Sequence, residues 1–100
     1  MDLNNMQGCR LPDVPIVGWT GTSVPDLQPG EYHRLGKTLW MMKAPNGEEG
    51  AIDQTKHTVV EHEDGTITVS PSILIYPHRT IDGHTPGWHG YLERGIWITC

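Results

Sequence analysis

The segment "HTVVEHEDGTITVSPSILIYPH", residues 57–78, decides the fold class of this chain. Thr, Val and Ile recur in it, and these β-branched residues favour the pleated surface of a strand. Asp64-Gly65 separates two alternating runs, which is a strong short-range sign of a β-hairpin. We therefore expect an antiparallel hairpin here, with one face on a core and the other in water.

Two turn geometries are open at Asp64-Gly65, and they differ in which side chains face the core. A two-residue loop would put these four side chains on the core face: Val60, His62, Ile67 and Val69. It would put these four on the solvent face: Glu61, Glu63, Thr66 and Thr68. A type I turn with a glycine bulge is the competing geometry, and it would change the pairing near the tip.

From residue 31 onward, the rest of the chain also consists of short runs separated by turn residues. Further strands are expected at "KTLWMMKAP" (37–45), "GAIDQ" (50–54), "PSILIY" (71–76), "WHGYL" (88–92) and "IWITC" (96–100). "PHRTIDGHTPG", residues 77–87, is expected to be a polar loop, and Pro71 marks either the start of a strand or a bulge. No segment repeats apolar residues with a helical period over three turns. The sequence predicts an all-β fold, a small antiparallel sandwich or open barrel of six or seven short strands with little or no helix.

The chain has 100 residues, the size of one domain. Residues 1–30 contain four Pro and four Gly and are expected to form an irregular N-terminal arm, whereas residues 31–100 form a single β domain. Within the arm, "PIVGWT" (15–20) could add an edge strand or cover the domain, with Trp19 as its anchor.

Composition argues against several classes of partner. The net charge is −5, and the seven Lys and Arg residues are scattered without a basic stripe, so no nucleic-acid partner is expected. No apolar run approaches the length of a membrane span, so no membrane partner is expected. "MDLNNMQGCRLP" lacks the pattern of a secretory signal, and we therefore expect Cys9 and Cys100 to be reduced thiols.

Two stretches carry a resemblance to a known group of proteins. "HEDGTITVSPSILI" (62–75), followed by "PGWHGYLERGIW" (86–97), resembles short uncharacterised proteins encoded by bacteriophages and prophages, and "KAPNGEEG" (43–50) is also similar. The match covers residues 31–100. Some relatives place a cysteine before the histidine, where this chain has Trp88. The resemblance implies a phage-type origin and a location in the host cytoplasm, and it implies no reaction.

Histidines and a cysteine are the candidate metal ligands. They are His57, His62, His78, His84, His89 and Cys100. Zinc takes four N or S ligands, often in tight pairs, and no pair here has that spacing. His57 and His62 are five residues apart, which places them on opposite faces of a strand. The zinc alternative therefore uses His84, His89 and Cys100, and our main expectation is no metal and no cofactor.

Motifs of catalysis and nucleotide binding give no site. "EHED" (61–64) gathers carboxylates around His62, but on an extended strand Glu61 and Glu63 point away from it. G-x-S-x-G, G-x-G-x-x-G and the P-loop pattern are absent. We therefore expect no catalytic residue.

Aromatic residues supply the remaining candidate surface. Because the chain has no Phe, we expect Trp40, Trp88, Trp97 and Tyr91 to fill the core. Trp and Tyr also dominate protein–protein contacts.

The expected partner surface is Trp88, His89 and Tyr91 with His84 from the 77–87 loop; the alternative is a Trp88 buried under that loop. The sequence thus predicts a non-catalytic, phage-type accessory protein that binds a host protein, a phage protein or a second copy. A host factor or defence component is the expected target. The alternative function is a small zinc protein, structural or hydrolytic.

Overall fold

A computed structural model describes residues 5–15 and 24–100. In this part of the chain there are eleven strands and no helix, which confirms the predicted all-β class. Seven strands have four residues or more: β3 (Glu31–Leu35), β4 (Leu39–Lys43), β5 (Glu49–Asp53), β6 (Thr58–Glu61), β7 (Ile67–Ile75), β10 (Trp88–Glu93) and β11 (Ile96–Thr99). The shorter ones are β1 (Asn5–Gln7), β2 (Cys9–Arg10), β8 (Arg79–Thr80) and β9 (Gly83–His84).

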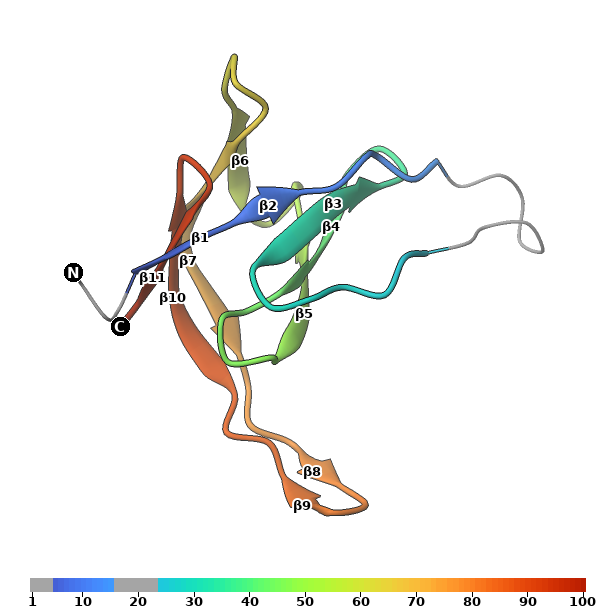
Figure 1. Ribbon diagram of the computed structural model, residues 1–100, viewed down its shortest axis with the longest axis vertical. Helices are drawn as coiled ribbons and strands as arrows, with labels where there is room; N and C mark the ends of the chain where they lie inside the picture. The colour runs from blue at the N-terminus through green and yellow to red at the C-terminus, as the bar shows by residue number, and fades with distance from the viewer. Residues whose placement is uncertain (1–4, 16–23) are drawn as a thin grey trace.

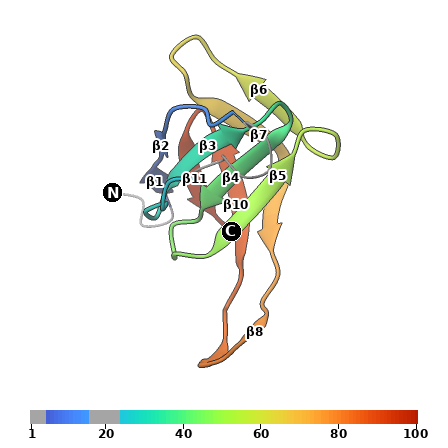
Figure 2. The same cartoon turned by 90° about the vertical axis from the view of Figure 1, so that its right-hand side faces the viewer.

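The strands form two packed layers. One sheet has the order β1-β11-β10-β7-β6, the other has the order β2-β3-β4-β5, and β8-β9 is a separate ladder. Figure 2 shows β3, β4 and β5 lying across the sheet that contains β7 and β10. Within residues 5–15 and 24–100, every ladder is antiparallel except the short β2–β3 pair.

The segment from β1 to β2 joins the two layers along one side. β1 pairs with β11 of one sheet, and β2 pairs with β3 of the other. The connecting Gly8 donates its N–H to the Gly95 carbonyl at 2.7 Å, and an added Cβ would lie only 2.6 Å from that oxygen. Residues 5–10, expected to be irregular, therefore contribute two strands; the predicted anchor Trp19 lies outside the described residues. On the opposite side, β5 and β7 approach each other without forming a ladder, so the barrel is open there.

Aromatic rings fill the space between the layers. The buried cluster is Tyr32, Trp40, Met42, Ala44, Ile52, Ile67, Val69, Ile73, Trp88, Leu92 and Trp97. The Trp97 ring packs edge-on against Trp88 at 5.3 Å and against Tyr32 at 6.5 Å between ring centroids. Trp40, Trp88 and Trp97 thus occupy the core as predicted, whereas Tyr91 is only half-buried.

The turn of the 57–78 hairpin is the glycine-bulge type, not the two-residue loop. His62 N–H donates to the Thr66 carbonyl at 2.8 Å, and Gly65, with φ of +88°, donates to the His62 carbonyl at 3.0 Å. This loop pairs Val59 with Val69, so Val59 packs against the core and Val60 is 47% exposed. The two-residue loop, which put Val60 on the same face as Val69, was therefore wrong. The extra loop residue exchanges the residues of β6 that face the core for those that face solvent.

Pro71 lies inside a strand, at a bulge. β7 runs without a break from Ile67 to Ile75, and its register with β10 shifts between Gly90 and Leu92. Proline has no N–H to donate to a ladder, and a bulge is where a sheet tolerates that loss. Of the two roles predicted for Pro71, the bulge is confirmed.

The stretch predicted as a polar loop, residues 77–87, carries the short β8–β9 ladder. Figure 1 shows this hairpin projecting beyond the two layers. No helix among the described residues is long and apolar enough to cross a bilayer.

Candidate functional site

Exposed apolar side chains recur in the sequence from the end of β7 to the turn of the β8–β9 hairpin. The large apolar side chains that are exposed among the described residues are Val24, Val60, Leu74, Tyr76, Ile81 and Ile96. Three of these six, Leu74, Tyr76 and Ile81, fall within residues 74–81, and we call these three the hairpin surface. Tyr76 is 73% exposed, and Ile81, between β8 and β9, is fully exposed.

Hydrogen bonds near its base hold this hairpin in place. Thr85 N–H donates to the His78 carbonyl at 2.8 Å, and His78 N–H donates to Thr85 Oγ1 at 3.1 Å. At the root, Asn46 Nδ2 donates to the Gly87 carbonyl at 2.8 Å, and Gly87 N–H donates to buried Glu48 at 3.3 Å. A two-residue ladder alone would be marginal in water. The contacts from the β4–β5 turn therefore fix where the hairpin leaves the barrel.

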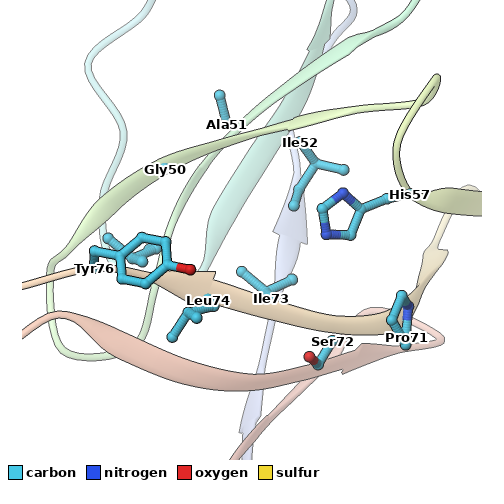
Figure 3. Close-up of a pocket in the computed structure, with 10 residues that line it drawn as sticks. Gly50, Ala51, Ile52, His57, Pro71, Ser72, Ile73, Leu74 and Tyr76 are labelled. Carbon is cyan, nitrogen blue, oxygen red and sulfur yellow. The ribbon is translucent and has the colours of Figure 1, made fainter.

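The open side of the barrel contains a groove, which we call the seam. It has a volume of about 450 Å³ and lies between β5 and β7. Its lining is Gly50, Ala51, Ile52, His57, Pro71, Ser72, Ile73, Leu74, Ile75 and Tyr76. Figure 3 shows the His57 ring between the strands, directed toward Ile52 and Ile73. The Nδ1 atom of His57 is buried without a hydrogen-bond partner.

A second polar cluster joins three parts of the chain. Glu61 accepts hydrogen bonds from Arg10, at 3.1 Å, and from Arg34. Both guanidinium groups lie 4.9 Å from the centroid of the Trp40 ring. Burial lowers the pKa of Arg10, but hydrogen bonds to Asp13 and Glu61 outweigh it and raise the pKa above its ordinary value. The charges of this cluster are paired, and it contains no nucleophile. It links β2, β3 and β6, and we call it the clamp.

Sequence reasoning missed both the clamp and the seam. Arg10 and Glu61 are 51 residues apart, and Glu61 reaches the arginines only because the bulged turn sets its face. The seam lies beyond the point where the pairing of β6 with β7 stops, at Thr58 and Ser70. No local sequence pattern marks that point. The one signal that could have found it is His57, a polar residue directly before an apolar strand.

The predicted partner surface is divided by the structure. Trp88 is only 6% exposed and its indole N–H donates to Thr99 Oγ1 at 3.3 Å, so the buried alternative applies to this residue. His89 and Tyr91 stay together on the outer face of β10, with ring centroids 6.4 Å apart. His84 lies on β9, in the projecting hairpin.

The zinc alternative brings two of its three residues together. Cys100 N–H donates to the His89 carbonyl at 3.1 Å, so the two residues lie opposite each other across β10 and β11. His84 belongs to the separate β8–β9 ladder. Residues 5–15 and 24–100 contain no group of three His, Cys, Asp or Glu side chains placed to hold a metal ion. Cys9 and Cys100 are both free and exposed, as expected.

The acidic hairpin tip is built as a turn. Asp64 accepts hydrogen bonds from the Thr66 hydroxyl at 2.6 Å and the Thr66 N–H at 3.0 Å, and these hold the pKa of Asp64 below its ordinary value. His62 Nε2 lies 2.7 Å from Thr68 Oγ1. His57, in contrast, lines the seam. The two histidines therefore lie in different surroundings, His62 beside Thr68 and His57 in the seam.

No protein-family model, no curated protein and no solved structure matches this chain.

Proposed function

We propose that this chain is a phage-type accessory protein that acts in the host cytoplasm by binding another protein, without catalysis and without a cofactor. The observation that carries the proposal is the hairpin surface. A fully exposed isoleucine on an anchored, projecting hairpin leaves apolar area in water. Burying such a side chain against a partner would stabilise the complex by about 1.5–3 kcal/mol.

The polar clusters of the described residues support a role without catalysis. Arg10 and Arg34 are both paired with Glu61 beside Trp40, and Asp64 accepts a hydrogen bond from Thr66. Groups used in this way hold turns and layers together. Phage origin comes from the sequence resemblance, and a host factor or defence component remains the target that this origin favours.

The proposal is tested with Ile81→Asp, which puts a charge on the hairpin surface. Tagged wild-type protein, Ile81→Asp and the matched control Val60→Asp are each used to capture proteins from bacterial lysate, with quantification by mass spectrometry. We expect a partner that Ile81→Asp captures at least about tenfold less well, the equivalent of about 1.4 kcal/mol, because the charge would be desolvated on binding. Val60 is also exposed but lies on β6, so Val60→Asp should capture the partner as well as wild type does. Capture of no partner, or equal loss with both variants, contradicts the proposal.

The zinc alternative makes a different prediction for the purified protein. Because only His89 and Cys100 are neighbours, whereas zinc takes four ligands, we expect zinc well below one equivalent after growth with added zinc. Elemental analysis of wild type beside Cys100→Ser measures this directly. Stoichiometric zinc in wild type that is lost in Cys100→Ser would favour the zinc protein instead.

A further inference from the structure

One half of β7 has an open edge. β6 pairs with β7 from Ile67 only as far as Ser70, which lies opposite Thr58. Beyond Ser70, the ladders of the described residues pair β7 with β10 alone, on its other edge. The open edge borders the seam, across from β5 (Figure 3).

Alternation of the backbone shows which groups face this edge. The His89 carbonyl accepts from Cys100, so the backbone groups of His89 point toward β11. Successive residues of a strand direct their N–H and C=O groups to opposite edges, so Gly90 points toward β7, where it pairs with Ile73. It follows that Ile73 bonds toward β10, whereas Ser72 and Leu74 direct their backbone groups away from β10, into the seam.

The lining of the seam indicates the charge of its occupant. The chain carries a net charge of −5, yet no Asp, Glu, Lys or Arg side chain lines the seam. The titratable side chains in its lining are those of His57 and Tyr76, and the buried Nδ1 atom of His57 lacks a hydrogen-bond partner. An ionised side chain would lose its hydration there without an opposite charge to replace it. Charge complementarity therefore selects an uncharged segment.

We propose that the seam binds an extended, uncharged segment of the partner protein, which adds to the open edge of β7 as a strand. Backbone hydrogen bonds to Ser72 and Leu74 give this mode its affinity, and alternate side chains of the segment face Ile52 and Ile73. Tyr76 belongs both to the seam and to the hairpin surface, so one partner can contact both. The proposal rests on the protein-binding function above and names the part of the partner that binds.

A synthetic peptide, acetyl-KTVTVTVK-amide, is the probe. Its interior alternates uncharged residues of high strand propensity, and its terminal lysines keep it soluble. Added to isotope-labelled wild-type protein, it should shift the amide resonances of Ser72 and Leu74 more than those of the outer face of β10. A peptide N-methylated at every interior amide cannot donate along either edge and should leave the spectrum unchanged.

Leu74→Pro and Leu74→Ala form a matched pair of variants. Both remove the leucine side chain, but only proline removes the N–H that faces the seam, and the ladder bonds toward β10 are unaffected. We expect Leu74→Pro to bind the peptide at least about tenfold more weakly than Leu74→Ala does, since both variants lack the leucine side chain and a lost hydrogen bond contributes on this scale. If Leu74→Pro does not fold, the N-methylated peptide against wild type decides the question.

The outcomes separate this proposal from the proposed function. Equal binding of the peptide by Leu74→Pro and Leu74→Ala, or shifts confined to other parts of the chain, overturns the seam as a strand acceptor. A lysate partner that depends on Ile81 but binds Leu74→Pro and Leu74→Ala equally leaves the protein-binding function standing without the seam. Sedimentation that shows a dimer in wild type, lost in Leu74→Pro, overturns the partner segment in favour of a second copy.

Discussion

Replacing Trp97 with alanine is expected to lower the free energy of unfolding by about 3–5 kcal/mol. Trp97 is fully buried, and its ring contacts Trp88 and Tyr32, so alanine would leave a large cavity between the layers. Natural domains are stable by only about 5–15 kcal/mol, so the variant should be largely unfolded at modest denaturant concentration. Urea titration followed by far-ultraviolet circular dichroism measures the change.

Trp97→Phe is the matched control for this prediction. Phenylalanine keeps most of the ring contacts but loses the indole N–H, which donates to the Gly30 carbonyl at 2.9 Å. That carbonyl also accepts from Cys9, so the loss should cost only about 1 kcal/mol. A Trp97→Ala variant that unfolds at the wild-type midpoint would show that the three-ring cluster does not hold the layers together.

The 57–78 hairpin shows how far sequence patterns specify this fold. Alternation and Asp64-Gly65 predict the strands and the turn, because both are local properties of the backbone. They do not choose between a two-residue loop and a bulged one, and that single residue decides whether Val59 or Val60 faces the core. The position of Glu61 beneath Arg10 and Arg34 follows from the same choice.

The candidate sites were less predictable than the strands. The seam exists because β6 begins at Thr58, opposite Ser70, while β7 continues to Ile75, and relative strand lengths follow from tertiary pairing. The hairpin surface depends on Glu48 and Asn46, which reach Gly87 from about forty residues away in sequence. Composition indicated that residues 77–87 are polar, but no local sequence pattern showed that the Ile81 side chain would be fully exposed.

Trp88 is a case where a local signal existed. An aromatic residue beside a loop fits either the core or a surface, and the sequence left both open. Gly90 lies two residues on, so it shares the strand face of Trp88, and the Trp88 ring lies where a Gly90 side chain would stand. A glycine two positions from a tryptophan in one strand is therefore a sign that the ring folds inward over it.

The same contact predicts the second large effect, that of Gly90→Ala. A Cβ at Gly90 would overlap the Ile98 carbonyl oxygen and would lie 2.5 Å from the Trp88 ring. The carbonyl belongs to β11 and cannot retreat without disturbing the β10–β11 ladder. We expect a loss of about 3 kcal/mol in the free energy of unfolding, at the upper end for overpacking, and a fall of roughly 15 °C in the thermal midpoint.

Gly65→Ala is the control that separates the steric cost of an added methyl group from the cost of backbone strain at positive φ. Gly65 has φ of +88°, but an added Cβ there meets nothing within 4 Å, so alanine would cost only backbone strain of about 1 kcal/mol. Thermal unfolding of both variants by circular dichroism should therefore rank Gly90→Ala well below Gly65→Ala. Equal midpoints would mean that β11 moves to accept the methyl group. The close contact between the Trp88 ring and Gly90 would then not explain why Trp88 is buried and absent from the partner surface.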